Sequence, residues 1–254
     1  MRNLYGHKFR LPKGTQVFVP SANGYEIGEA IARRVAKEWR APAFYYHMQS
    51  GGHVAAARQH INSAHIASVD LAGFFNQVTR TKVHRSLCQV GFRHEEALEI
   101  ARDSTVEEEP GSRRFSLPFG FVQSPILASL ALSRSALGRA IKKANTSTVS
   151  ISVYVDDITV SSCQLNDLND ALDSLRRAAH LSGFEFNEAK SQGPATEIRC
   201  FNLVLGNGTM TVADDRYQQF IIAIQGGFPE QQEGILAYVE SVNPAQQLTL
   251  RAYV

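Results

Sequence analysis

The sequence predicts an α+β fold in which helices back an antiparallel sheet, and three segments carry this prediction. In 150–160, two runs of alternating and β-branched residues flank a pair of adjacent aspartates, which is typical of a hairpin. Upstream, 65–75 begins as a buried strand that delivers an aspartate at its end. Between these two segments, 116–130 runs from a loop with proline and glycine into a long apolar helix.

The region before the first aspartate is expected to form one strand and two helices. Residues 16–20 alternate as a short strand. Apolar residues at helical spacing predict an amphipathic helix over 26–39. A glycine pair then interrupts the chain, and a second helix is expected over 53–61.

Helices are expected to dominate the rest of the chain. The predicted ranges are 80–90, 95–102, 124–143 and a segment from a cap at Asn166 or Asp167 to about His180. The acidic stretch 105–112 is expected to be a solvated loop.

Composition indicates an ordinary folded protein. Its 254 residues are 44% hydrophobic and 20% charged, and no apolar run is long enough to predict a membrane span. Residues 1–5 contain no apolar signal core. Cys88, Cys163 and Cys200 lie far apart without metal-ligand spacing, so we expect buried small side chains in a reducing cytoplasm.

Charge is distributed unevenly along the chain. Residues 1–40 hold eight basic residues against three acidic ones, whereas 205–254 hold two basic against five acidic. A basic beginning suits a surface that follows phosphates, but a solvated helix face explains either half more simply, so charge alone decides little.

The three segments resemble motifs A, B and C of reverse transcriptases of the bacterial retron and group II intron lineage. The motifs are Asp70 with Phe74-Phe75, Leu117-Pro118-x-Gly120-x-x-x-Ser124-Pro125, and Tyr154-Val155-Asp156-Asp157 (YVDD). They occur in the family's order, with Asp156 lying 86 positions after Asp70. Residues 184–190 and 198–206 resemble motif D and the primer-grip hairpin. The resemblance implies a right-hand polymerase palm over 65–206 with finger insertions around 79–116, fingers over 1–64 and a short helical thumb-like segment over 207–254.

The resemblance also implies a two-metal site. Asp70 and Asp156 would bridge two Mg²⁺ or Mn²⁺ ions, and the Leu71 carbonyl and Asp157 would assist. Adjacent carboxylates repel each other unless a cation lies between them, and Mg²⁺ prefers oxygen ligands. The alternative for the aspartate pair is a hairpin turn without a function, because aspartate also suits turns.

The remaining site residues are assigned by the same resemblance. Phe75 falls at the sugar gate that favours deoxynucleotides, although Phe74 or Phe75 must belong to the core. Phe119 replaces a glutamine that is usual in relatives, which predicts altered nucleotide handling. The other assignments are Gln123 beneath the nucleotide, Lys190 near the triphosphate, Lys13 (or Arg10) as the fingers contact, and Phe201, Leu203 and Gly206 in the primer grip.

The leading interpretation is an RNA-directed DNA polymerase that uses deoxynucleoside triphosphates, an RNA template and a DNA product. It would serve a bacterial element, or an antiviral defence system with a dedicated noncoding RNA. Two alternatives stay open: template-independent or protein-primed DNA synthesis, and a non-catalytic RNA-binding scaffold. The apolar residues of 207–254 would be buried either against the chain's own palm or against a second protomer, a companion protein or RNA.

Overall fold

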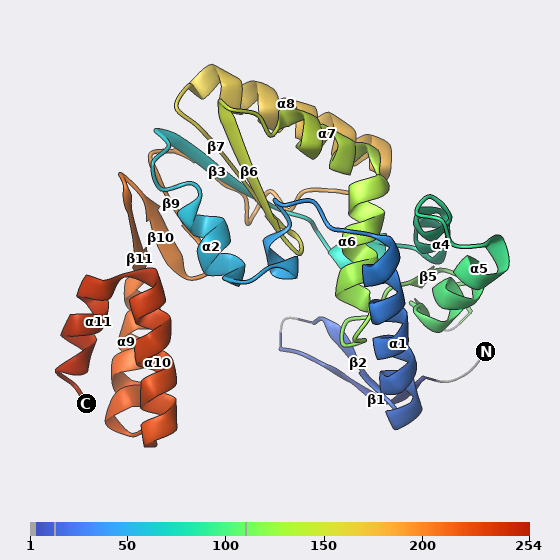
Figure 1. The fold of residues 1–254 in the computed structure, drawn as a ribbon, viewed down its shortest axis with the longest axis horizontal. Coiled ribbons are helices and arrows are strands. Elements are labelled where there is room, and N and C mark those ends of the chain that lie inside the picture. The colour runs from blue at the N-terminus through green and yellow to red at the C-terminus, as the bar shows by residue number, and fades with distance from the viewer. Residues whose placement is uncertain (1–3, 13, 110) are drawn as a thin grey trace. The chain divides into compact units, whose positions relative to one another are not determined.

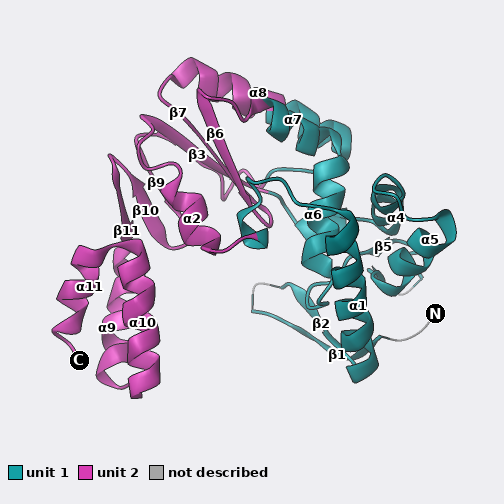
Figure 2. Ribbon diagram, viewed as in Figure 1, with its two compact units in different colours: residues 1–48, 71–143, 175–186 teal, residues 49–70, 144–174, 187–254 magenta. Residues whose placement is uncertain are grey.

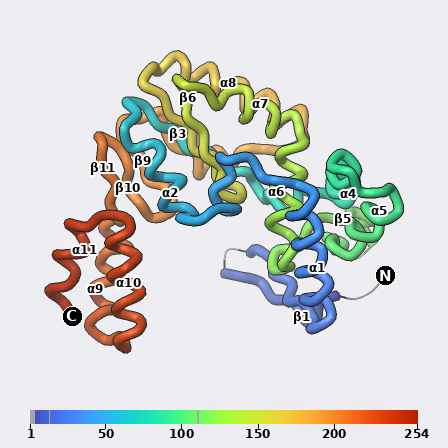
Figure 3. The backbone as a smooth tube through the Cα atoms, viewed as in Figure 1, coloured from blue at the N-terminus to red at the C-terminus, as the bar shows by residue number. Residues whose placement is uncertain are grey.

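The computed structural model describes residues 4–12, 14–109 and 111–254. The chain forms two compact units, and each unit is assembled from three separate stretches (Figure 2). Unit 1 comprises Met1–Met48, Leu71–Lys143 and Leu175–Phe186; unit 2 comprises Gln49–Asp70, Ala144–Ser174 and Asn187–Val254. Stretches of the two units alternate along the chain, whose course Figure 3 traces from the N-terminus to the C-terminus. The division into fingers, palm and thumb stays a prediction.

Unit 2 contains a four-stranded antiparallel sheet in the order β6–β7–β3–β8 (Figure 1). Its strands are β3 (His65–Asp70), β6 (Val149–Tyr154), β7 (Asp157–Ser162) and β8 (Gln192–Ala195). Every residue of β3 after His65 is buried, which is typical of a central strand covered on both faces. The predicted hairpin and the predicted buried strand are thus confirmed, and they are neighbours in one sheet.

The second half of unit 2 is a three-stranded antiparallel sheet covered by the C-terminal helices. The sheet has the order β11–β10–β9, and α2 (Gly52–Arg58) contacts its middle strand as well as β6. The elements are β9 (Glu197–Cys200), β10 (Leu203–Gly206), β11 (Thr209–Val212), α9 (Asp214–Gln225), α10 (Pro229–Val242) and α11 (Pro244–Arg251).

The apolar residues of the C-terminal segment are mostly accounted for by the core of unit 2. Phe220, Ile224, Val239 and Leu250 are buried in one cluster with the apolar side chains of β9, β10 and β11. Two apolar residues of this segment, Ile222 and Leu248, instead lie on the surface. Burial within unit 2 therefore accounts for most of the apolar residues of this segment.

Unit 1 begins with a β-hairpin of β1 (Tyr5–Arg10) and β2 (Gln16–Pro20), followed by α1 (Ala22–Glu38). The Ser21 hydroxyl accepts from the Gly24 N–H at 3.1 Å and so caps α1. The other elements are a short 3-10 helix (Tyr46–Met48), α3 (Phe74–Gln77), α4 (Arg80–Cys88), α5 (His94–Asp103), α6 (Ser124–Arg134) and α7 (Ala136–Ala144). Helix α6 contacts both α1 and α4 and is buried almost all round, as its apolar sequence predicts. Helix α8 (Leu165–Ser182) continues from unit 2 into unit 1.

Several expectations from the sequence are wrong in detail. Helix α8 begins at Leu165, so Asn166 and Asp167 lie inside it rather than capping it. The helix expected over 124–143 breaks at Ser135, whose backbone is extended and whose hydroxyl accepts from the Gly138 N–H at 3.1 Å. The expected loop over 105–112 contains β4 (Val106–Glu107), which pairs with β5 (Phe115–Ser116). Of the cysteines, Cys200 is buried as expected, Cys88 is half-buried and Cys163 is exposed.

None of the helices in the described residues combines the length and the hydrophobicity that crossing a bilayer requires.

Candidate functional site

Three carboxylates meet at one end of the four-stranded sheet of unit 2. Asp70 is the last residue of β3 and Asp157 is the first residue of β7, and the antiparallel register places them directly opposite each other. Asp156 precedes Asp157 in the two-residue connection between β6 and β7, where Tyr154 pairs with Asp157. Sheet register alone therefore gathers the three aspartates that the sequence predicts as a site.

The connection that carries Asp156 is conformationally strained. Val155 has a φ of 59°, a value that glycine adopts readily but a β-branched residue rarely does. Strain of this kind costs on the order of 1–3 kcal/mol and persists where the surrounding structure enforces it, as at many active sites. Here the enforcing element is the continuous β6–β7 ladder on both sides of the turn.

Burial and neighbouring negative charge raise the pKa values of Asp156 and Asp157. Burial, followed by the charges of Asp156 and Asp70, raises the pKa of Asp157 to about 7. Burial also raises the pKa of Asp156, and the Asp70 charge adds to the effect. A site of this kind holds either protons or a cation at neutral pH.

Lys190 supplies one positive charge to this cluster. Its ammonium Nζ lies 3.0 Å and 3.2 Å from the two carboxylate oxygens of Asp70. The Asn187 N–H donates to the Asp70 carbonyl at 2.8 Å and the Lys190 N–H donates to the Asn187 carbonyl at 3.0 Å, so the backbone fixes Lys190 beside Asp70. The hydrogen bond with Asp70 raises the pKa of Lys190, which therefore stays charged.

A buried histidine joins the two strands of the hairpin behind the carboxylates. His60 Nε2 lies 2.8 Å from the Ser152 hydroxyl of β6, and its Nδ1 lies 2.7 Å from the Ser161 hydroxyl of β7. The ring is fully buried, and burial lowers the pKa of His60 to about 3. A neutral imidazole therefore cross-links β6 and β7, a role that the sequence does not reveal.

Leu71 directly follows Asp70, and its side chain is buried. It forms an antiparallel bridge with Phe186 in which the flanking hydrogen bonds run from the Ala72 N–H to Glu185 and from the Asn187 N–H to Asp70. The Leu71 carbonyl takes no part in these two hydrogen bonds. Its oxygen is the kind of ligand that a hard cation prefers.

Phe75 and Phe119 lie side by side in unit 1. Their ring centroids are 5.4 Å apart at 88°, an edge-to-face pair. Phe119 is exposed and Phe75 half-buried, whereas Phe74 is buried against Phe184. Of the two adjacent phenylalanines, Phe74 thus belongs to the core and Phe75 has a surface available for a ligand.

The loop that carries Phe119 is attached to β2. The Phe18 N–H donates to the Phe119 carbonyl at 2.8 Å, and Gly120 follows with a φ of 111°. A Cβ on Gly120 would lie 2.4 Å from the Phe18 carbonyl oxygen, so this position requires glycine. The Ser124 hydroxyl closes the loop by donating to the Pro118 carbonyl at 2.8 Å.

Gln123 lies beneath the surface of the loop that carries Phe119. Gln123 is buried, and its Nε2 donates to the Ser104 hydroxyl at 3.4 Å, so its side chain supports the loop from within. Lys13 lies outside the described residues.

The predicted primer-grip residues lie in the β9–β10 hairpin of unit 2. Phe201 and Asn202 form its two-residue turn, both with positive φ, while Leu203 and Gly206 are buried. Phe201 lines a cavity of about 530 Å³ together with other aromatic side chains and Arg216. The Phe201 ring lies 5.3 Å from Tyr154, which precedes the turn with the two aspartates.

Residues 17–203 match the protein family described as reverse transcriptase (RNA-dependent DNA polymerase). The chain belongs to this family. The three segments that resemble motifs A, B and C all fall within the matched region, as do the three aspartates and Lys190. No match was found among curated protein sequences.

Solved reverse transcriptases share this fold. A telomerase from Candida albicans in complex with a fragment of telomeric RNA has a TM-score of 0.54 and 11% identity, over 91% of this chain and 48% of that chain. A foamy-virus protease–reverse transcriptase in complex with double-stranded DNA has a TM-score of 0.50 and 16% identity, over 91% and 34%. At such identities the likeness shows the fold alone, and the chain spans between a third and a half of these larger proteins.

Sequence reasoning missed several neighbours of the reverse transcriptase motifs. His53 and Tyr238 line the cavity beside Phe201, and His53 Nε2 lies 3.1 Å from the Tyr238 hydroxyl. These residues come from segments far apart in the chain, so no local pattern points to them. The pairing of Lys190 with Asp70 was likewise not predictable, since a lysine in motif D implies only a role near the triphosphate.

Proposed function

We propose that this chain is an RNA-directed DNA polymerase that uses two Mg²⁺ or Mn²⁺ ions. The single observation that carries the proposal is the assembly of Asp70, Asp156 and Asp157 at one end of the sheet, in a chain of the reverse transcriptase family. A scaffold without activity would gain nothing from three mutually repelling carboxylates.

The residues present fit hard divalent cations. Burial and the charges of Asp156 and Asp70 raise the pKa of Asp157 even with Lys190 beside Asp70, and a bound cation would offset this cost of ionisation. Carboxylates and a backbone carbonyl are the donors that Mg²⁺ prefers. Asp70 and Asp156 would bind both ions, with Asp157 and the Leu71 carbonyl completing the set. When bound, two such ions activate the primer 3′-hydroxyl and stabilise the leaving pyrophosphate.

Lys190 is suited to two successive roles. The Lys190 side chain is 63% exposed and has a flexible stem, whereas the Asp70 side chain is 9% exposed and Asp70 is fixed in β3. Lys190 can therefore leave Asp70 when a cation arrives, and its charge and proton then become available to an anionic phosphate beside the site.

The two phenylalanines support a preference for deoxynucleotides. A half-buried Phe75 held against Phe119 presents a rigid ring, and a rigid ring excludes a ribose 2′-hydroxyl by steric contact. Phe119, being apolar and exposed, offers a base or sugar a packing surface without a directional hydrogen bond.

The aromatic cavity of unit 2 supports a role for Phe201 in holding the primer. Aromatic side chains stack on nucleobases of any sequence, and Arg216 adds a positive charge for a phosphate. Because Leu203 and Gly206 are buried, they would shape the hairpin while Phe201 makes the contact.

We further infer a bacterial, cytoplasmic setting in which a noncoding RNA supplies the template, in a mobile element or an antiviral defence system. The support is the resemblance of the three motifs to the retron and group II intron lineage. Sequencing the nucleic acid that co-purifies with the protein tests this inference; random cellular RNA without a dominant species would contradict it.

Primer extension on an RNA template tests the polymerase proposal. Asp156→Asn should abolish Mg²⁺-dependent deoxynucleotide incorporation, because losing a metal ligand costs about 3 kcal/mol or more, a fall of over about 100-fold. Asp214→Asn, an exposed carboxylate at the start of α9, is the matched control and should retain activity. Full incorporation by a folded Asp156→Asn protein would refute the proposal.

A further inference from the structure

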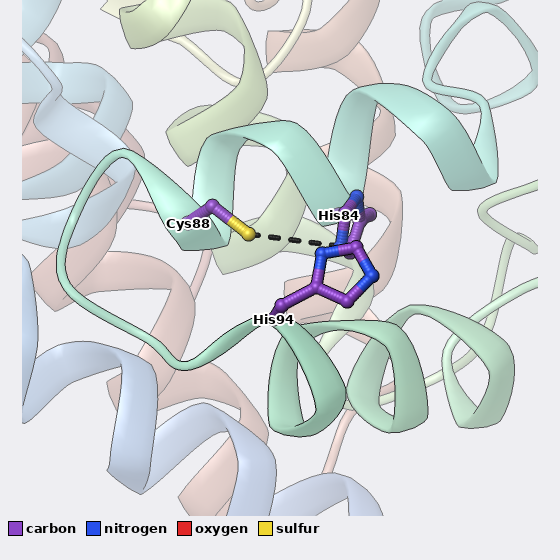
Figure 4. A group of neighbouring side chains, drawn as sticks. All are labelled: His84, Cys88 and His94. Atoms are coloured by element: carbon purple, nitrogen blue, oxygen red, sulfur yellow. Dashed lines mark hydrogen bonds between the residues drawn. The ribbon is translucent and has the colours of Figure 1, made fainter.

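A second group of possible metal ligands lies in unit 1 and contains no catalytic aspartate. Figure 4 shows His84, Cys88 and His94 pointing toward one another. One ligand atom from each residue can be chosen so that all three atoms lie within 4.8 Å of one another. His84 and Cys88 come from α4, and His94 is the first residue of α5.

The distances suit a tetrahedral ion. His84 and Cys88 are four residues apart and so share one face of α4. The Cys88 sulfur lies 3.6 Å from His84 Nε2. Bonds of about 2.3 Å to sulfur and about 2.05 Å to nitrogen, at a tetrahedral angle, place the two donors about 3.6 Å apart. This pair therefore needs almost no movement to bind an ion.

His94 approaches the pair from the second helix. Its ring centroid is 4.7 Å from that of His84, and the two rings are nearly perpendicular at 86°. A small rotation of the exposed His94 side chain brings a ring nitrogen to bonding distance, since it lies within 4.8 Å of the other donors already.

The connection between the helices holds the three residues together without a metal. Gly91, with a φ of 105°, turns the chain, and its N–H donates to the Cys88 carbonyl at 3.2 Å. Phe92 is buried, and its N–H donates to the Leu87 carbonyl at 3.2 Å. Helices α4 and α5 also pack directly against each other. The ligands are therefore preorganised by the fold.

The donor set selects the metal. Two imidazoles and a thiolate suit Zn²⁺, whereas the Mg²⁺ of the proposed polymerase site prefers oxygen. No fourth histidine, cysteine, aspartate or glutamate joins the group within the described part of the chain, and His94 is exposed, so water completes the tetrahedron.

We propose that His84, Cys88 and His94 bind one Zn²⁺ that joins α4 to α5. Binding removes the thiol proton of Cys88 to solvent and leaves both histidines neutral, so the bound ion and its protein ligands carry a net charge of +1. The ion acts as a cross-link between two short helices, and it stabilises the folded state because the unfolded chain does not hold the three ligands together. This site is independent of the polymerase proposal.

Titration of the full chain with Co²⁺ tests the site, in reducing buffer with excess Mg²⁺ to occupy the carboxylates. We expect one equivalent of Co²⁺ to produce a thiolate-to-cobalt charge-transfer band and strong visible bands of four-coordinate cobalt, both displaced by Zn²⁺. Cys88→Ser should abolish the charge-transfer band. It should also weaken Zn²⁺ binding by more than about 100-fold, since altering only the surroundings of ligands costs 10–100-fold.

Cys163→Ser is the matched control, because it removes an exposed cysteine outside the group and should leave the spectrum unchanged. His94→Ala is the second variant, since an exposed side chain at a helix start is removed with little effect on folding. It should weaken Zn²⁺ binding and abolish the Zn²⁺-induced rise in melting temperature seen in the unaltered chain. A charge-transfer band that survives in Cys88→Ser, or an unaltered chain that shows none, would overturn the proposal.

Discussion

Replacing Asp157 by asparagine should make the metal-free protein more stable while destroying its proposed site. Burial and the neighbouring carboxylates raise the pKa of Asp157 from 3.8 to about 7. The native state therefore keeps a proton that the unfolded chain releases between these two values, so stability falls as the pH rises through this window. A shift of about three pH units corresponds to about 4 kcal/mol above pH 7.

Asparagine has nearly the same shape and cannot ionise, so the substitution removes this cost. Because Asp157 is partly exposed and coupled to Asp156, we expect a gain of about 2–4 kcal/mol in the free energy of unfolding at about pH 8. The gain should shrink by about 1–2 kcal/mol at about pH 5.5, where the wild-type carboxyl is protonated in the native state.

Urea denaturation with EDTA at both pH values measures the effect, and Asp214→Asn serves as the exposed control. Mg²⁺ should then stabilise the wild type and reverse the order of the two proteins, because only the wild type retains the full ligand set. An Asp157→Asn protein that is less stable than the wild type at about pH 8, or a gain that does not vary with pH, would refute the reasoning.

Three further perturbations follow from the packing. Phe75→Val should raise ribonucleotide relative to deoxynucleotide incorporation in single-nucleotide assays, and an unchanged ratio would assign Phe75 to the core. Gly120→Ala should lower the free energy of unfolding by at least about 2 kcal/mol, because the added Cβ would clash with the Phe18 carbonyl oxygen. Gly6→Ala is the control: Gly6 has open space around it, so the free energy of unfolding should change by about 0.5 kcal/mol or less. Burial lowers the pKa of His60 to about 3, so the histidine stays neutral in the folded protein. In the unfolded chain it gains a proton below its ordinary pKa of 6.5, so about 2 kcal/mol of stability is lost by about pH 5. His60→Gln should flatten that part of the pH profile, and an equally steep fall in both proteins would contradict the assignment.

The carboxylate site was predictable because each of its parts is local. Strand periodicity identifies the ends of β3 and the β6–β7 hairpin, and the register of an antiparallel sheet then brings Asp70 opposite Asp157. The loop that carries Phe119 was also predictable from a local pattern, because Pro118 and Gly120 flank Phe119 in the sequence.

The missed features are either local details outside the motifs or contacts between distant segments. The break at Ser135 interrupts an otherwise continuous helical pattern, and it is stabilised by the serine's own cap on the next helix. The pairing of Lys190 with Asp70 joins residues 120 positions apart. Cys88 has no second cysteine near it in the sequence, whereas its neighbours in space are His84 and His94.

The position of β3 between β7 and β8 determines when the site can form during folding. The β6–β7 hairpin closes over two residues, but pairing of Asp70 with Asp157 closes a loop of the 86 residues 71–156. Closing this longer loop costs about 3 kcal/mol more in conformational free energy than closing the hairpin. The hairpin with Asp156 and Asp157 can therefore form early, and β3 must insert later. A nascent or partly folded chain thus carries two carboxylates without the third. Mg²⁺ binding in refolding experiments should consequently appear only with the last cooperative step, after most helical signal has been regained.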